Sequence, residues 1–479
     1  MNEQLLSYLA GLLSKIPVLA KLPGPIVSTI EKQAYKLMVE KGDTAQFSRH
    51  ELEDKFYIAA NVVRAALKGY SRGSSAVRRE LAEIFLKGFF GPTEGMKKFK
   101  EKYGDEPPSF LVIAPTGFCN LKCKGCYAVS APIKSLGSLT AEEFDWILTS
   151  KYNEWGSWFT VITGGEPYIW RDGDIDFVEM ARRHPESYFM TYTNGTLIDK
   201  KLAKRIAEVG NITPAISLEG FEKETDERRG KGTYRKILSA MDNLLEVGVP
   251  FGISVTAVPT NAELILSDEF LDFFFNEKGA LYQWIFQYMP IGRGIEVSRQ
   301  ISPEMRRKMW YREQVLVREK RLFVADFWNS GPFSSGCIAG GRSGGYFYID
   351  WKGRVTPCAF VPFYVDNIRD LRANGKTLTD ALFSDYLKAV RCWQRSYNYK
   401  KPVNERGNEI RPCIIRDHHE AIHKIVLETN AKPLDENAEY VLTDPSYYEG
   451  MLKYDKETAE LLDPIWEELY RDKVAVPER

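Results

Sequence analysis

The sequence predicts an α/β fold: a partial (β/α)6 TIM-like barrel, preceded by a helical N-terminal region and followed by a small C-terminal domain. Three observations predict it. Six short apolar runs alternate with segments of helical period, polar motifs follow several of these runs, and 479 residues suffice for two or three domains. The expected parts are residues 1–108 (helical region), 109–325 (barrel), 326–430 (small domain) and 431–479 (helical tail).

The charge balance excludes some classes of protein. The chain has 65 Lys and Arg against 65 Asp and Glu, which disfavours a protein that binds nucleic acid through its phosphates. The short cluster at Lys97, Lys98, Lys100 and Lys102 is interpreted as a solvated helix face. No run approaches the ~18 apolar residues of a membrane span, and the N-terminus lacks the features of a signal peptide. We therefore expect a cytoplasmic location.

The first hundred residues have helical patterns and no convincing strand. Apolar residues recur at helical spacing from Leu5 to Ile16, and further helices are expected from about Val27, over 53–67 and over 76–86. Leucines in the opening segment alternate with Lys15, Lys21, Lys32 and Lys36, as in a helix that lies in a membrane interface. The alternative is that they pack on the barrel. Peripheral contact with the cytoplasmic face of a membrane through these helices therefore stays open.

The barrel strands are expected where the apolar runs lie: 110–114, 159–163, 188–193, 213–218, 252–258 and 284–289. The intervening helices carry good end signals. Thr140 and Glu143 form a capping box, and two apolar stripes end at Gly210 and Gly248.

After the last of these strands, a helix is expected over 303–320. A hairpin-like turn at Trp351, Lys352 and Gly353 follows, between runs 346–349 and 354–356. Helices then resume over 378–392 and 417–427 and in an acidic, aromatic tail.

Seven cysteines divide into a tight trio and a dispersed quartet. An odd number argues against a disulfide framework, and clustered thiols in a reducing compartment favour metal binding. The trio, Cys119, Cys123 and Cys126, lies in the loop after the first strand. A tetrahedral zinc or a [4Fe–4S] cluster takes four ligands, so three cysteines leave one metal position open. A zinc site that takes a remote fourth ligand is the alternative.

The trio and the motifs after the later strands resemble the radical S-adenosylmethionine (SAM) enzymes over roughly residues 110–415. The cysteine spacing is that family's C-x3-C-x2-C signature, and Gly164, Gly165, Glu166 and Pro167 match its GGEP motif. Two glycines let the backbone approach a ligand, and a carboxylate can hold an ammonium group. One departure is that Gly125, where the family often has an aromatic residue, precedes the third cysteine and Tyr127 follows it.

The resemblance implies a [4Fe–4S] cluster on the trio, with its open iron chelated by SAM. It implies that Glu166 holds the amino end of SAM, that Ser217 and Glu219 face the ribose, that Arg229 neutralises the carboxylate, and that the segment after the sixth strand faces adenine. The residues expected to contact SAM are Tyr127, Gly164, Gly165, Glu166, Pro167, Asn194, Ser217, Glu219, Arg229 and Tyr288. An electron donor of the flavodoxin or ferredoxin type is implied as a partner.

The quartet resembles part of the SPASM extension, in its shortened form called a twitch domain. Cys337 and Cys358 bracket Gly353 in the pattern C-x15-G-x4-C, and Cys392 and Cys413 complete four ligands for a second, auxiliary [4Fe–4S] cluster. The alternative is that Cys392 and Cys413 are ordinary buried thiols and that the cluster keeps an open iron. His418, His419 and His423 follow closely and could also donate a ligand.

The resemblance therefore predicts an oxidoreductase that generates a 5′-deoxyadenosyl radical and abstracts hydrogen from an unactivated carbon. A peptide or protein substrate, oxidised or cross-linked, is placed first because such auxiliary domains commonly occur in peptide-modifying enzymes. A lipid acyl chain is the second candidate, and a non-catalytic iron–sulfur or zinc protein is the third.

Overall fold

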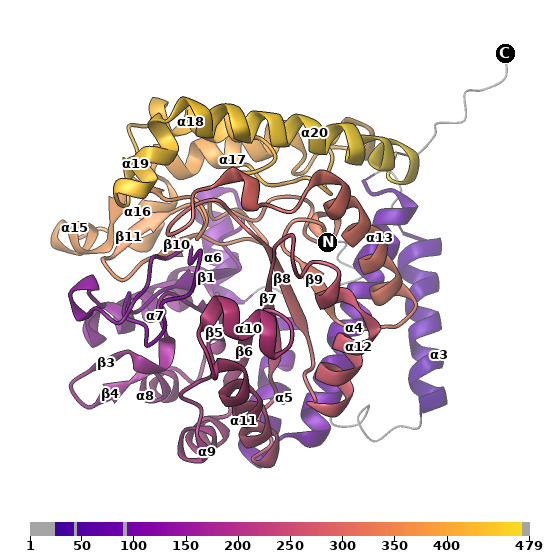
Figure 1. Cartoon of the computed structure of the whole chain (residues 1–479), viewed down its shortest axis with the longest axis vertical. Coiled ribbons are helices and arrows are strands. Elements are labelled where there is room, and N and C mark those ends of the chain that lie inside the picture. The colour runs from indigo at the N-terminus through magenta and orange to yellow at the C-terminus, as the bar shows by residue number, and fades with distance from the viewer. Residues whose placement is uncertain (1–23, 43–45, 90–92, 472–479) are drawn as a thin grey trace.

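The computed structural model describes residues 24–42, 46–89 and 93–471 (Figure 1). The expected helix between Leu5 and Ile16 lies outside these ranges. No helix within them combines the length and the hydrophobicity needed to cross a bilayer.

One mixed sheet of ten strands dominates the described residues, in the order β13-β11-β10-β1-β2-β5-β6-β7-β8-β9. Every pair from β10 to β9 along this order is parallel, so the carboxyl ends of these strands meet at one rim. The edges of the sheet, β13 and β9, are not neighbours in that order, and the barrel is open. The parallel strands are β1 Phe110–Ile113, β2 Phe159–Ile162, β5 Tyr188–Thr193, β6 Ile212–Leu218, β7 Gly252–Ala257, β8 Gln283–Gln287, β9 Val324–Asp326 and β10 Tyr348–Ile349.

The six predicted strands are confirmed, and β9 and β10 extend the sheet on either side of them. β10 pairs in parallel with β1, with Val112 opposite Tyr348. The segment expected to form a separate C-terminal domain thus supplies a strand to the barrel sheet. β9 crosses the proposed boundary at residue 325, so the two parts share one framework.

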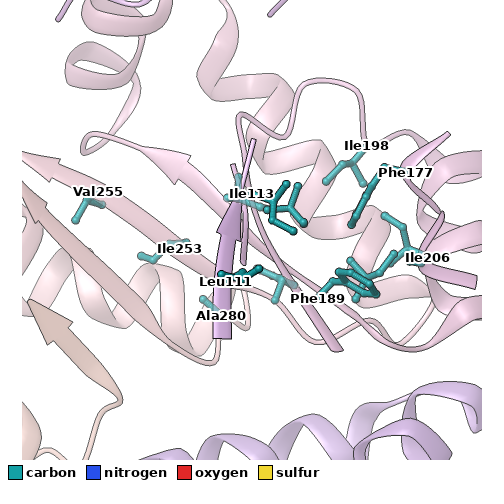
Figure 2. Close-up of a cluster of buried hydrophobic side chains, with 14 of the residues drawn as sticks. Leu111, Ile113, Phe177, Phe189, Ile198, Ile206, Ile253, Val255 and Ala280 are labelled. Atoms are coloured by element: carbon teal, nitrogen blue, oxygen red, sulfur yellow. The ribbon is translucent and has the colours of Figure 1, made fainter. Parts of the chain in front are cut away.

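Successive side chains of the parallel strands point alternately outward and inward. Leu111 and Ile113 of β1 face the outer helices and are fully buried with Phe177 and Ile206 (Figure 2). Val112 and Ala114 belong instead to an inner apolar cluster that continues into residues 326–451. The barrel interior and the C-terminal part therefore share one core.

Helices cover the outer face of the parallel strands. They are α7 Ala141–Trp155, α8 Phe177–Arg183, α9 Lys200–Val209, α10 Glu222–Arg229, α11 Thr233–Glu246, α12 Asp268–Leu271 and α13 Pro303–Arg318. The capping box of α7 is confirmed: the Thr140 hydroxyl accepts from the Glu143 N–H at 3.1 Å, and the Glu143 carboxylate accepts from the Thr140 N–H at 2.9 Å. Gly210 ends α9 in the left-handed conformation, as its position predicts.

Replacing Thr140 with alanine removes one half of this capping box. We expect the free energy of unfolding to fall by about 1 kcal/mol, the usual worth of an N-cap hydroxyl. Urea denaturation measures it. Thr443→Ala is the matched control, because that exposed hydroxyl lies near the end of a helix and only bonds back to Glu439. An equal fall in the free energy of unfolding in both variants would contradict a specific role for the Thr140 cap.

The N-terminal helices are α3 Gly24–Tyr35, α4 Arg49–Arg72, α5 Ser75–Phe89 and α6 Glu94–Tyr103. Buried polar contacts fix α4 to distant parts of the chain. The Asn61 amide donates to the carbonyls of Val317 and Leu322, both at 2.9 Å, and the Lys55 ammonium donates to the Pro332 carbonyl at 2.6 Å. The N-terminal region is thus tied by hydrogen bonds to residues 317–332.

The C-terminal part contains the predicted turn, with Tyr348 opposite Thr356 in an antiparallel pair. The helix expected over 378–392 is interrupted at Phe383 and Ser384, and Ser384 caps the second half. The long α20 lies along one side of the molecule, shown in yellow in Figure 1. The elements are α14 Gly331–Ser334, β11 Arg354–Thr356, β12 Phe363–Tyr364, β13 Asp366–Asn367, α15 Ile368–Ala373, α16 Leu378–Leu382, α17 Asp385–Tyr397, α18 His419–Glu428, β14 Lys432–Pro433, α19 Glu436–Thr443 and α20 Pro445–Leu469.

Candidate active site

A cavity of about 430 Å³ lies within the curve of the sheet and is lined by two sets of cysteines. The N-terminal trio, Cys119, Cys123 and Cys126, comes from the loop after β1. The C-terminal trio, Cys337, Cys358 and Cys413, comes from residues beyond β9. The fold therefore brings two groups far apart in the sequence to a single internal space.

Two arginines hold the loop of the N-terminal trio in shape. Arg293 donates to the carbonyl of Cys123 at 2.7 Å, and its own backbone N–H donates to the carbonyl of Cys126 at 3.0 Å. Arg228 donates to the carbonyl of Lys124 at 3.1 Å. Sequence reasoning missed both arginines. The available signals were the position of Arg293 between two glycines after β8 and that of Arg228 beside Arg229.

Burial disfavours negative charge on the thiols of the N-terminal trio. It raises the pKa of Cys119 to about 12, with a further contribution from the nearby Glu166 carboxylate. It also raises the pKa of Cys123, against the opposing effect of Arg229. Two N–H groups point at the Cys119 sulfur, from Leu121 at 3.4 Å and from the Asn194 amide at 3.7 Å. A bound cationic centre would stabilise the thiolates here.

The spacing of the thiols bears on which metal centre they suit. In the described residues, no three His, Cys, Asp or Glu side chains are grouped to hold a single metal ion. Each cysteine of a [4Fe–4S] cluster binds a different iron, so its sulfurs lie further apart than the ligands of one ion. Three thiols, with two N–H donors to the Cys119 sulfur, are a donor set that suits a [4Fe–4S] cluster with one open position.

The GGEP segment follows β2 directly and packs on the cysteine loop. Gly165 lies so close to that loop that a Cβ at this position would be 2.0 Å from the carbonyl oxygen of Phe118. Glu166 is fully buried and does not line the cavity. Its carboxylate accepts from the Thr193 hydroxyl at 2.7 Å and from the Asn194 N–H at 2.8 Å. It therefore ties the end of β2 to the end of β5, and Pro167 also lies behind the cavity wall.

Gly165→Ala tests this close approach. The added methyl group must displace the cysteine loop, and a shift of ~1 Å at a reacting centre can cost about a hundredfold in rate. We expect the SAM cleavage that the sequence resemblance predicts to fall by about that factor, and iron incorporation to fall with it. Gly450→Ala is the control, because a Cβ there meets only ordinary contacts with Val297. Unchanged SAM cleavage and iron content in the Gly165→Ala variant would contradict a role for this close packing in holding the cysteine loop.

Polar residues at the ends of β5 and β6 complete one side of the cavity. Asn194 lines it and donates to Asn120 at 2.9 Å. Ser217 lines it and shares a hydrogen bond of 2.9 Å with Ser254. Glu219 lies behind the wall, where one oxygen accepts from Arg228 at 2.6 Å and from Arg229 at 2.5 Å. Both arginines line the cavity, and Glu219 fixes where they point.

Two tyrosines approach the cavity from different sides. Tyr288 lies over Gly125, where a Cβ would be 2.8 Å from its ring, and its hydroxyl donates to the carbonyl of Gly294 at 2.6 Å. The absence of a side chain at Gly125 thus makes room for an aromatic ring from the segment after β8. Tyr127 shares a hydrogen bond of 2.7 Å with Thr163, and its ring lies 5.3 Å from that of Phe360.

The C-terminal trio is a close group of its own. The thiols of Cys337 and Cys358 both contribute to raising the pKa of Cys413, after burial and the Asp417 carboxylate. Burial raises the pKa of Cys358 to about 12, although its sulfur shares a hydrogen bond of 3.0 Å with the Tyr346 hydroxyl.

The structure does not bring the predicted quartet together. Cys392 is exposed and does not line the cavity. Helix α17 buries Tyr386, Leu387, Val390 and Gln394, and Cys392 falls outside that face. The three histidines also lie outside the cavity lining, and each bonds a backbone carbonyl: His418 that of Arg411, His419 that of Ile415 and His423 that of Leu442.

Part of the chain matches a family model, and longer parts of it are similar to known proteins. Residues 113–266 match the model of the Radical SAM superfamily. The chain is 25% identical over 291 residues to the AdoMet-dependent heme synthase of Methanosarcina barkeri, covering 55% of this chain and 80% of that protein. It is 26% identical over 294 residues to the mycofactocin maturase MftC of Mycobacterium ulcerans, covering 60% and 76%. A crystal structure of Streptococcus suis SuiB is similar with a TM-score of 0.49 and 21% identity, covering 66% and 71%.

The matched range begins at the end of β1 and contains the N-terminal trio, the GGEP segment and the ends of β2, β5, β6 and β7. These are the elements that build one side of the cavity. Residues 113–266, which carry these elements of the parallel sheet, match the Radical SAM superfamily, and this match supports a radical SAM enzyme.

Proposed function

We propose that this protein is a radical SAM oxidoreductase that abstracts hydrogen from an unactivated carbon of a substrate held in the cavity. The observation that carries the proposal is the shared cavity. The N-terminal trio, the glycines of the GGEP motif, Asn194, Ser217 and Arg229 all line it.

Each group of residues has a distinct task. The N-terminal trio holds a [4Fe–4S] cluster and leaves one position open. When bound, this cluster supplies the electron that cleaves SAM to methionine and a 5′-deoxyadenosyl radical. Gly164 and Gly165 let the backbone approach SAM, and Arg229 faces its carboxylate. Asn194, Ser217, Tyr127 and Tyr288 contact the rest of SAM or the substrate beside it.

Glu166, Pro167 and Glu219 act from behind the cavity wall. Glu166 is held by donors from β5, so it positions Asn194 rather than binding the ammonium group itself. Glu219 positions the two arginines.

The C-terminal trio holds the auxiliary [4Fe–4S] cluster in this proposal and leaves one of its irons open, because the exposed position of Cys392 does not support it as a fourth ligand. Both clusters then border the same space, which suits electron transfer to or from a substrate radical and hence oxidation or bond formation. A flavodoxin or ferredoxin type donor supplies the initial electron.

The relatives suggest more than one class of substrate. The name of the mycofactocin maturase favours a peptide or protein precursor, and that of the heme synthase favours a tetrapyrrole. The class of substrate therefore has to be inferred from the lining of the cavity.

The test is anaerobic reconstitution with iron and sulfide, followed by reduction in the presence of SAM. We expect about eight irons per chain and release of 5′-deoxyadenosine. Four or fewer irons with no SAM cleavage would instead support the non-catalytic iron–sulfur protein.

A further inference from the structure

The cavity continues from the two cysteine trios into the barrel interior, where its wall is apolar. Residues two apart in the chain line it together. They are Phe110 and Val112 on β1, Phe159 and Val161 on β2, Trp284 and Phe286 on β8, and Ala325 on β9 with Phe323 and Phe327, which directly flank that strand. Met190 and Tyr192 on β5 continue this wall. Such alternation aims one whole face of each strand into the cavity.

The apolar wall extends over the full length of the strands. Phe110 and Phe159 are the first residues of β1 and β2, and the cysteine loop follows the last. From Phe323 to Phe327 the wall spans four residues, about 13 Å at the rise of a strand. Ile58 of α4 also lines the space, and Phe360 lies near Phe286, with a ring separation of 5.8 Å. Aromatic residues therefore line the space at both ends of the strands.

Most charged and polar side chains in the cavity lining already form ion pairs or hydrogen bonds with other residues of the protein. The lining cations, Arg228 and Arg229, both bind Glu219. The lining carboxylate, Asp326, accepts from the Gln287 amide at 2.8 Å, and Ser217 is bonded to Ser254. Among the described lining residues, the buried side-chain atoms without a hydrogen-bond partner are Ser130 Oγ, Gln287 Oε1 and Trp328 Nε1.

We propose that the substrate presents a linear hydrocarbon chain, of acyl, alkyl or isoprenoid type, which lies in this apolar space with a carbon near the N-terminal trio. This inference rests on the proposed function and specifies its substrate class. A peptide segment in the same space would bring backbone N–H and C=O groups against a wall with few partners for them. The lining cations are Arg228 and Arg229. Both are paired with Glu219, and Arg229 faces the SAM carboxylate in the proposed function, so little positive charge is left for a substrate with several carboxylates.

Binding is tested on the reconstituted holoenzyme with SAM and without reductant. The probes are linear ω-bromo-1-alkanols of increasing length, whose bromine quenches tryptophan fluorescence on contact, and Trp284 and Trp328 line the cavity. Each buried CH2 should strengthen binding about fourfold until the space is filled. Affinity that does not depend on chain length would overturn the proposal.

Two variants locate the binding. Ala325→Phe places a ring inside the space, and Met190→Gln places an amide there with almost no change in size. We expect each to weaken binding of the longest probe at least tenfold, while Leu427→Phe, at a site 55% exposed, has no effect. Circular dichroism melts identify any variant that fails to fold. If Ala325→Phe and Met190→Gln both fold and both bind the longest probe with unchanged affinity, the probe does not bind in this cavity and the proposal is contradicted.

Turnover separates this inference from the function on which it rests. With reductant present, we expect a saturated alcohol or fatty acid of matching length to stimulate 5′-deoxyadenosine release. Stimulation by an N-acetylated tetrapeptide amide of leucine and valine, but by no alkyl probe, would overturn the hydrocarbon proposal and leave radical SAM chemistry intact. Length-dependent binding of the alkyl probes without any SAM cleavage would support the hydrocarbon proposal and overturn the proposed radical SAM function.

Discussion

Replacing Cys123 with alanine is expected to abolish SAM cleavage and to lower the iron content from about eight to about four per chain. Cys123 lines the cavity in the loop that Arg228 and Arg293 hold in place. Changes to outer residues of metal sites already cost ten- to a hundredfold, so loss of a ligand should lower release of 5′-deoxyadenosine by more than about a hundredfold. Iron analysis and chromatography of the anaerobic reaction measure both effects.

Two further cysteines provide the controls. Cys392→Ala should retain all the iron and full SAM cleavage, because that thiol is exposed and outside the cavity lining. Cys413→Ala should lose the auxiliary cluster, retain about four irons and still cleave SAM, since the N-terminal trio is intact. Loss of four irons in the Cys392 variant would show that the quartet assembles after all.

Replacing Arg306 with methionine is expected to lower the free energy of unfolding by about 3–5 kcal/mol. Arg306 and Asp417 are both fully buried and form two hydrogen bonds, at 2.5 and 3.1 Å. Arg306 also donates to the carbonyl of Ile410 at 2.9 Å, and Asp417 accepts from the Cys413 N–H at 3.1 Å. Removing the arginine leaves a buried carboxylate without its counter-charge, between α13 and the loop of the C-terminal trio.

Denaturant unfolding of the iron-free chain measures this cost without interference from cluster loss. Lys308→Gln is the matched control on the same helix, because its partner Glu263 and Lys308 itself are both more than 60% exposed. Such a pair is worth about 1 kcal/mol or less. The double variant Arg306→Met with Asp417→Leu should be more stable than the single one, because it removes both charges. A single variant as stable as the Lys308 control would contradict this interpretation.

The core of the barrel could be predicted because its signals are local. Each central strand is a short apolar run bounded by polar residues, and the capping box at Thr140 and Glu143 marks a helix start within four residues. The motifs that follow β2, β5 and β6 are likewise continuous in the sequence. Their convergence follows from parallel pairing, which places the carboxyl ends of strands at one rim.

The edges of the parallel array could be predicted only in part, because they depend on distant partners. The hairpin that contains β10 could be predicted from its turn, and β10 pairs with β11 as expected. Its parallel pairing with β1, more than 200 residues earlier, has no local signal. β9 has three residues, too few for an apolar period to distinguish it from a loop, and its strand character comes from pairing with β8.

In the candidate site, too, local motifs could be predicted and contacts between distant residues could not. Spacing alone identifies the N-terminal trio, but which carboxylates face the cavity depends on side-chain partners that a motif does not contain. Glu166 and Glu219 are both turned toward protein donors. The exposure of Cys392 depends on which face α17 buries, and the role of Arg293 depends on a contact with a loop about 170 residues away.

In the proposed function SAM would lie against the N-terminal trio in the cavity, and its amino nitrogen would bind the open iron of the cluster. Electron–nuclear double resonance of the reduced protein, with SAM labelled with nitrogen-15 at that amino group, tests it most directly. We expect a nitrogen-15 coupling on the cluster signal in the wild type and in the Cys413→Ala variant, and none in Cys123→Ala. A reduced cluster in the wild type that shows no such coupling at saturating SAM would contradict the claim.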